Sequence, residues 1–160
     1  MKKLLLLLLL SLPLAAEEQF AFIGTSISYH DAKLSSFDNT THTTGAFRVG
    51  KQTLKWRTTF SFEYGNDYGS AGLNVDYILL DEMFGTPKLR PYLGANINYL
   101  HYSNNNIADS NGYSYGGQAG FIIYANDTVD IDIGYHYNLV GKIEGLDTVQ
   151  GATLSIHYFY

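Results

Sequence analysis

Five side chains in the last third of the sequence belong to the types used in hydrolysis and in metal binding. They are two carboxylates, two imidazoles and one hydroxyl, at Asp130, Asp132, His136, Ser155 and His157. In an extended strand, residues two apart lie on the same face, so Asp130, Asp132 and His136 share one face. A short antiparallel connection then places His157 across from Asp130. Such a set can form a catalytic triad or hold a metal ion.

A second pair with chemical potential is His101 and Ser103, a base and a nucleophile on the same face of a strand end, followed by Asn104. A nucleophile needs an oriented base and a third group before it becomes a catalyst. The simpler interpretation, which we favour, is a polar strand end that leads into an Asn-rich loop.

Charged residues in the middle of the chain alternate with apolar ones. If the turn between two neighbouring strands is centred on residues 51–52, Arg48 falls opposite Lys55, with Arg57 one inward step further on. Facing cations are unfavourable, so anions must complement them. The predicted network consists of Arg48, Lys55, Arg57, Glu63, Asp76, Asp130, Asp132, His136 and His157. We interpret it as a plug that neutralises a polar interior, with an ion gate as the alternative.

These side chains must be positioned by strands. The chain has 14 Tyr, 9 Phe and 16 Gly but only 3 Pro, a composition typical of β-structure with tight turns. Eight alternating segments of about ten residues are separated by Gly, Asn, Asp and Ser. They cover residues 20–29, 41–50, 54–64, 71–79, 90–102, 113–124, 129–138 and 151–160.

In every segment except the weaker first and second, one face is aliphatic or aromatic, while the charged residues share the other face with Gly, Asn and Ser. A soluble β-sandwich buries its apolar face and exposes its polar face to water. Here the polar face carries small and charged side chains, as the interior of a membrane barrel does, so the apolar face is the one expected to face lipid. β-Structure enters lipid only as a closed barrel. The sequence therefore predicts an all-β fold, an eight-stranded antiparallel up-and-down transmembrane β-barrel.

Connections alternate in length. Residues 51–52, 81–89 and 125–128 form the predicted turns on one side, and residues 30–40, 66–70, 103–112 and 139–147 form polar loops on the other. This pattern places both termini in the periplasm and the loops outside the cell. Eight strands enclose a space that side chains fill. A filled interior admits no substrate, so for the acid, histidine and serine set we favour a hydrogen-bond network over a triad or a metal site.

Aromatic residues gather where strands should meet the two membrane surfaces. Trp56, Tyr158 and Tyr160 are predicted at the periplasmic interface. The outer interface is predicted to contain Tyr29, Tyr64, Tyr99 and Tyr137.

The N-terminal residues have the pattern of an export signal. Lys2 and Lys3 precede a leucine-rich run, and Ala15 and Ala16 offer a cleavage site, so we expect a signal peptide at residues 1–16 and the barrel domain at residues 17–160. Without Lys2 and Lys3 the balance is 8 basic against 15 acidic residues, 8 − 15 = −7, which argues against nucleic acid as a partner. The chain has no Cys, so we expect neither a disulfide nor a lipoprotein anchor.

Residues 90–95 (RPYLGA), residues 132–137 (DIGYHY) and the aromatic C-terminus resemble the small eight-stranded outer-membrane β-barrels of the OmpA/OmpX and opacity-protein type, the outer membrane protein beta-barrel domain of the porin family. The resemblance implies location in the cell outer membrane of a Gram-negative organism. It also implies that Ile156, Tyr158 and Tyr160 form the signal read by the barrel assembly machinery. Phe is the usual last residue of that family, and Tyr160 departs from it. Because the family's peptidoglycan-binding domain has no counterpart here, we do not expect cell-wall tethering.

Residues 101–104 (HYSN) resemble the His-x-Ser-Asn segment of outer-membrane lipid A deacylases. In those enzymes the segment lies in the penultimate strand and a Glu follows, whereas here the next Glu after Asn104 is Glu144. We therefore expect no enzyme, and a lipid A hydrolase using His101 and Ser103 remains the less favoured alternative.

The leading hypothesis is an integral outer-membrane protein with a structural or surface-interaction role, no cofactor and no bound metal. Expected partners are outer-membrane lipid, the assembly machinery and surface ligands of the polar outer loops; closure by eight strands favours a monomer. A narrow gated pore is the alternative. A soluble lipocalin-like carrier is disfavoured because the inward residues are polar.

Overall fold

A computed structural model describes residues 18–35, 39–79, 86–103 and 110–160. The expected signal peptide at residues 1–16 lies outside this part of the chain. The described residues form eight strands: β1 (Phe20–Leu34), β2 (Thr40–Gln52), β3 (Trp56–Tyr64), β4 (Tyr68–Ile78), β5 (Leu89–Tyr102), β6 (Ser110–Tyr124), β7 (Val129–Gly141) and β8 (Leu146–Phe159). No helix in the described part is long and apolar enough to cross a membrane.

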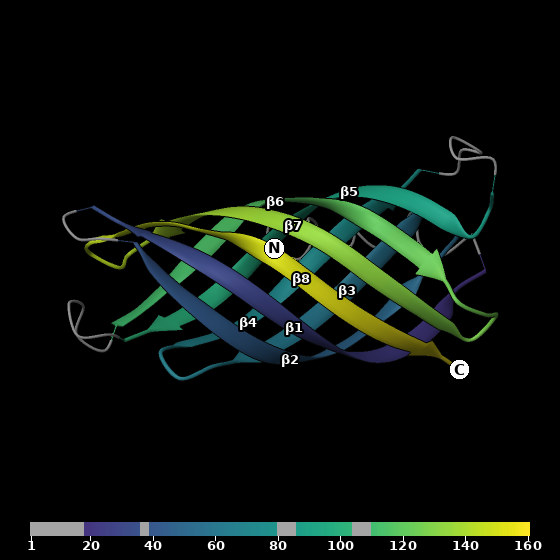
Figure 1. Cartoon of the computed structure of the whole chain (residues 1–160), viewed down its shortest axis with the longest axis horizontal. Coiled ribbons are helices and arrows are strands. Elements are labelled where there is room, and N and C mark those ends of the chain that lie inside the picture. The colour runs from purple at the N-terminus through teal and green to yellow at the C-terminus, as the bar shows by residue number, and fades with distance from the viewer. Residues whose placement is uncertain (1–17, 36–38, 80–85, 104–109) are drawn as a thin grey trace, which may run out of the picture.

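Each strand pairs antiparallel with the next, and β8 returns to pair with β1, so the sheet closes on itself (Figure 1). At the closing seam Gly24 of β1 lies opposite His157 of β8. The predicted eight-stranded up-and-down barrel is therefore confirmed. The C-terminus lies at the same end of the barrel as the short β2–β3 and β6–β7 turns (Figure 1).

The strands extend further at the loop end than the sequence predicted. β1 continues to Leu34, and the predicted loop at residues 139–147 shrinks to residues 142–145, between the ends of β7 and β8. Lys142 and Gly145 make this tight reversal in the left-handed backbone region, with φ values of 67° and 85°. Polar residues such as Asp31 still pair through their backbones with both neighbouring strands. Polar side chains at this end therefore belong to the rim of the barrel, and the strands do not end where these side chains begin.

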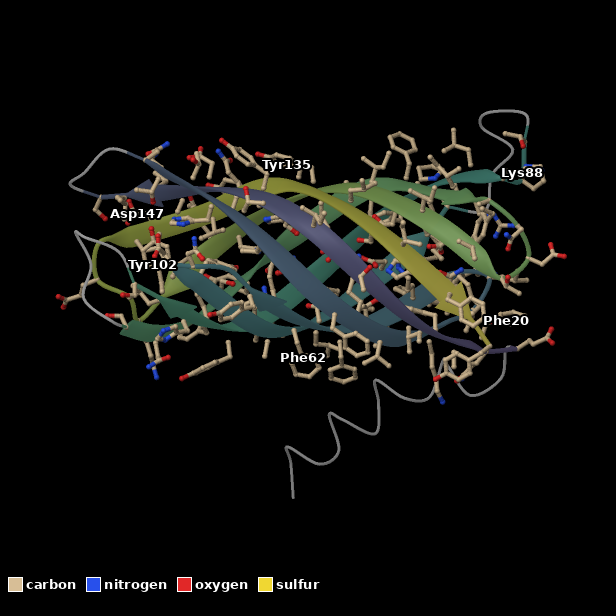
Figure 2. The ribbon with its side chains drawn as sticks, turned by 60° about the horizontal axis from the view of Figure 1, so that its bottom comes forward. Phe20, Phe62, Lys88, Tyr102, Tyr135 and Asp147 are labelled. Atoms are coloured by element: carbon tan, nitrogen blue, oxygen red, sulfur yellow. The ribbon has the colours of Figure 1, made fainter. Side chains whose placement is uncertain are left out.

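Large apolar side chains point away from the barrel on every strand (Figure 2). Phe62, for example, is 56% exposed and Ile27 is 64% exposed. A monomer in water rarely exposes a continuous apolar surface of this extent, so this face suits lipid.

Two groups of buried apolar side chains instead point inward, one toward each end of the barrel. At the end of the barrel with the C-terminus, Ile78, Tyr92 and Ile122 pack together. At the loop end a larger cluster of buried residues consists of Ala32, Leu34, Tyr68, Leu100, Tyr102, Ile143, Leu146 and Val149. Small, polar and charged residues were expected inside, so these two apolar clusters were not predicted.

The β2–β3 turn falls later in the chain than predicted. Gln52 pairs with Arg57, and Arg48 pairs with Ser61. The hydroxyl of Thr53 accepts hydrogen bonds from the backbone N–H groups of Lys55 and Trp56, and this fixes the reversal at residues 53–55. The predicted pairing of Arg48 with Lys55 is therefore wrong, and Lys55 is exposed in the turn, outside the lumen.

Candidate functional site

Arg57 is the centre of the inward-facing charges. It lies on β3 opposite Asp76 of β4 and has no exposed surface. Its Nε donates to Asp76 Oδ2 at 3.0 Å, and its Nη2 donates across the lumen to Asp132 Oδ2 at 2.5 Å. The guanidinium also lies 4.8 Å from the centre of the Tyr92 ring. One cation thus joins carboxylates from opposite walls of the barrel.

The second oxygen of each carboxylate also has a donor. Gln118 Nε2 donates to Asp76 Oδ1 at 2.5 Å, and the Tyr92 hydroxyl donates to Asp132 Oδ1 at 3.0 Å. All four oxygens are therefore satisfied, as buried carboxylates require.

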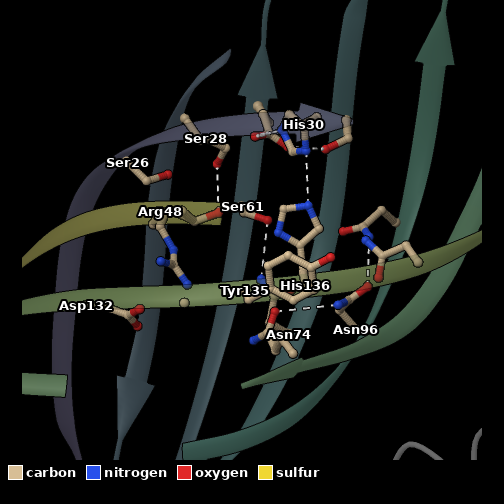
Figure 3. Close-up of a pocket in the computed structure, with 18 of the residues that line it drawn as sticks. Ser26, Ser28, His30, Arg48, Ser61, Asn74, Asn96, Asp132, Tyr135 and His136 are labelled. Carbon is tan, nitrogen blue, oxygen red and sulfur yellow. Dashed lines mark hydrogen bonds and ion pairs between the residues drawn. The ribbon is translucent and has the colours of Figure 1, made fainter. Parts of the chain in front are cut away.

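Arg48, the second inward cation, is buried on β2 and donates through Nη1 to the hydroxyl of Ser155 on β8. It lies near the Arg57 layer and lines the same cavity as Asp132 (Figure 3). Arg48 thus lies among polar lumen side chains, as predicted, but Lys55 does not lie beside it.

Asp130 and His157 form a buried pair. They occupy opposite positions on β7 and β8, and His157 Nδ1 lies 2.6 Å from Asp130 Oδ1. The other ring nitrogen, Nε2, has no hydrogen-bond partner among the described residues, and the ring packs 4.8 Å from that of Phe22. Ser155, the hydroxyl of the candidate triad, accepts from Arg48 instead. The set therefore lacks the contact between imidazole and nucleophile that a triad needs.

Nearer the loop end, Glu63 of β3 contacts the imidazole of His30, which in turn contacts that of His136. His30 Nε2 lies 2.8 Å from Glu63 Oε1, and His30 Nδ1 lies 3.0 Å from His136 Nε2. A carboxylate only accepts, so His30 Nε2 must carry a proton. Thr44 donates to Glu63 Oε1 at 2.5 Å. His30 was not predicted as a lumen residue because a loop was expected to begin there. Its alternation with Ser26 and Ser28 is the signal that could have identified it.

Between these layers lies a polar cavity of about 70 Å³, lined by serine, asparagine and glutamine side chains together with Arg48 and His136 (Figure 3). A cavity of this size has room for a few water molecules, since one needs about 10–15 Å³. The described residues contain no group of three or more His, Asp or Glu side chains arranged to bind a metal ion.

The hydrolase candidate lies on the outside of the barrel. His101 is exposed near the outer end of β5, and its Nδ1 lies 3.0 Å from Asn111 Oδ1. Ser103 is half-buried just beyond β5, where its backbone N–H donates to Asp67 O at 3.0 Å. Asn104, the last member of the motif, lies outside the described residues.

The predicted interface aromatics are exposed at the two ends of the strands. Trp56, Tyr158 and Tyr160 are exposed near the end of the barrel with the C-terminus. Ile156, two residues before Tyr158 on the same face of β8, is exposed as well. The outer set, Tyr29, Tyr64, Tyr99 and Tyr137, is also exposed.

Known proteins share this architecture with little sequence identity. Neisserial surface protein A is similar over 90% of this chain and 100% of its own, with a TM-score of 0.72 and 17% identity. Outer membrane protein H from P. aeruginosa covers 88% of this chain and 99% of its own, with a TM-score of 0.62 and 19% identity. A de novo designed transmembrane β-barrel is similar over 88% of this chain and 95% of its own, with a TM-score of 0.54 and 13% identity.

No protein-family model matches the chain, and no curated protein matches it by sequence. The structural likenesses show the fold, which is that of the small eight-stranded outer-membrane β-barrels.

Proposed function

We propose that the chain is an integral protein of the cell outer membrane, with a closed lumen and a structural or surface-interaction role. One observation carries this proposal: the lumen is filled by apolar clusters at both ends and by the ion-paired layer around Arg57. A solute that entered would have to displace fully buried side chains such as Tyr102 and Ile122. The outward-facing side chains of the strands, by contrast, can contact lipid, and the rim at the loop end can contact the surrounding medium.

The rim at the loop end is the surface we assign to contact with the surroundings. It is polar and carries exposed charges of both signs, among them Lys33, Asp67, Glu144 and Asp147. Surface residues positioned by rigid strands are well suited to recognition. The aromatic terminal strand supports insertion by the barrel assembly machinery, and the complete ring of eight strands supports a monomer.

A refolding experiment tests the membrane assignment. The chain without its expected leader, refolded in detergent, should migrate faster on a gel before heating than after it, as a closed barrel does. A chain that stays monodisperse and folded without detergent would contradict the proposal.

Planar-bilayer recording tests the closed lumen against the gated pore, which the polar cavity makes the second candidate. The wild-type protein should show no discrete conductance steps, and Arg57→Ala should not change this result. Steps in the wild type that Arg57→Ala alters would establish the gate.

A lipid A deacylation assay tests the hydrolase alternative. We expect no product from the wild type, and product that His101→Ala abolishes would establish the hydrolase instead.

A further inference from the structure

Two imidazoles share one hydrogen bond in the loop-end half of the lumen. His30 of β1 and His136 of β7, two strands that are separated by β8, are joined from Nδ1 to Nε2 at 3.0 Å, and Figure 3 shows this contact. A hydrogen bond needs one donor and one acceptor, so the two facing nitrogens hold a single proton between them. The other nitrogen of His30, Nε2, donates to Glu63 at 2.8 Å. In the neutral state each donor of this chain therefore has an acceptor, from His136 through His30 to Glu63.

The contact between the two rings tolerates one additional proton but not two. A proton added to His30 makes an imidazolium that donates through Nδ1 to a neutral His136 and through Nε2 to Glu63, whose charge balances it. A second proton, on His136, places N–H groups on both facing nitrogens. Two cations are then in contact and no acceptor lies between them. The doubly protonated pair must therefore separate.

The surroundings of the pair do not offset a second positive charge. The charged and titratable side chains that face this region are Glu63 of β3, His42 of β2, Asp67 before β4, Tyr68 of β4 and, along the cavity, Arg48, Tyr92 and Asp132, while β6 and β8 contribute Gln118 and Thr153, which do not titrate. Glu63 can balance one added proton, whereas Asp132 is already paired with Arg57. His42 lies opposite His30 on the paired strand and gains positive charge on acidification as well.

His30 also supports the apolar cluster at the loop end. Its ring stacks on that of Tyr68, with the ring centres 4.7 Å apart and an angle of 23° between the planes. Tyr68 lines the polar cavity and is also a buried member of the loop-end cluster. Separation of His30 from His136 therefore moves the ring against which Tyr68 packs.

We propose that His30 and His136 form a proton-binding pair that fixes the loop-end cluster at neutral pH and loosens it when both rings are protonated. The effect is confined to this half of the barrel, because neither ring belongs to the ion-paired layer around Arg57 or to the cluster of Ile78, Tyr92 and Ile122. The inference goes beyond the proposed function and does not depend on it, since it rests on contacts inside the barrel alone.

The test is methyl NMR of the chain without its expected leader, refolded in detergent, with isoleucine labelled at its δ1 methyl group. Ile143 reports on the loop-end cluster, while Ile78 and Ile122 report on the other cluster in the same spectrum. The pH is lowered from about 7.5 to about 4.5, a range that spans the usual titration of histidine. We expect the Ile143 signal to shift and to be broadened more strongly by a soluble gadolinium chelate at acid pH, whereas the Ile78 and Ile122 signals stay unchanged.

His136→Gln provides the decisive variant, because a glutamine side chain can offer either an N–H or an oxygen to His30 and takes up no proton. It should abolish the acid response of Ile143. His101→Gln is the matched control, since it removes an exposed imidazole on the outside of the barrel, and it should leave the response intact. In the wild type, imidazole nitrogen spectra should show both rings doubly protonated at the pH where Ile143 shifts.

Four results would overturn the proposal. They are an Ile143 signal that does not change at acid pH, an equal response of all three methyl groups, a response that persists in His136→Gln, and a shift of Ile143 while either ring is still neutral. The first, second and fourth are read from the wild-type protein alone, so the test does not depend on the folding of a variant.

Discussion

Replacing Arg57 by methionine should be among the most destabilising single substitutions in the lumen. The change removes two hydrogen bonds to buried carboxylates, those to Asp76 and Asp132. Hydrogen bonds to charged groups contribute about 1.5–3 kcal/mol each, so the pair accounts for about 3–6 kcal/mol. Breaking a buried ion pair by removing one partner costs about 3–5 kcal/mol, which agrees. We therefore expect the free energy of unfolding to fall by about 3–5 kcal/mol.

The assay is urea unfolding in lipid vesicles, followed by tryptophan fluorescence and by the loss of heat-modifiable mobility. Lys55→Met is the matched control, because it removes an exposed cation two residues away in the chain and should leave the midpoint almost unchanged. Arg57→Lys keeps the charge but lacks the fork that reaches both carboxylates, so it should give an intermediate loss.

A rescue variant separates charge from volume. Arg57→Met combined with Asp76→Asn and Asp132→Asn removes the uncompensated charges and should recover part of the lost stability. The reasoning is refuted if Arg57→Met unfolds at the same urea concentration as Lys55→Met, or if the triple variant is less stable than Arg57→Met alone.

Other substitutions test the remaining packing and pairing. His157→Phe leaves Asp130 without its imidazole donor and should lower the free energy of unfolding by about 1.5–3 kcal/mol in the same urea assay. Gly24→Ala places a methyl group against the His157 ring and the Ile156 carbonyl and should cost about 1–3 kcal/mol, while Gly45→Ala meets only the Ser26 carbonyl at an ordinary contact distance of 4.0 Å and should leave the midpoint almost unchanged; equal midpoints would contradict this. Tyr160→Ser should reduce the fraction of heat-modifiable protein in cell membranes and leave refolding in detergent unchanged; normal insertion in cells would remove its role as an assembly signal.

Local alternation made the strands and their faces predictable. In β3 the exposed residues Trp56, Phe60 and Phe62 alternate with the buried Arg57 and with other inward positions, and this depends only on the two-residue period of an extended chain. The same period, with one short connection, was enough to place His157 across from Asp130, and the structure brings the two together.

Features that depend on the details of turns and ends were not predictable in this way. The position of Lys55 depended on where the β2–β3 reversal falls, and the hydroxyl of Thr53 decides that point. Leu100 and Tyr102 are inward residues of β5 at the loop end, where apolar side chains no longer mark the lipid-facing side. Alternation predicts which face of the strand these residues lie on. It does not predict that they pack against side chains from β1, β4 and β8, which are distant in the sequence.

The need for hydrogen-bond donors to the lumen carboxylates explains why histidines accompany the arginines there. The inward carboxylates in the described part of the chain, Glu63, Asp76, Asp130 and Asp132, outnumber the inward guanidinium groups, Arg48 and Arg57. Asp76 and Asp132 share Arg57, while the other two carboxylates are each bonded to an imidazole. The polar groups of the interior thus bind mainly to one another, as in the core of a soluble protein, and stabilise the barrel. Under the proposed function, contacts with other molecules fall to the outer surface, where the polar rim carries exposed charges of both signs.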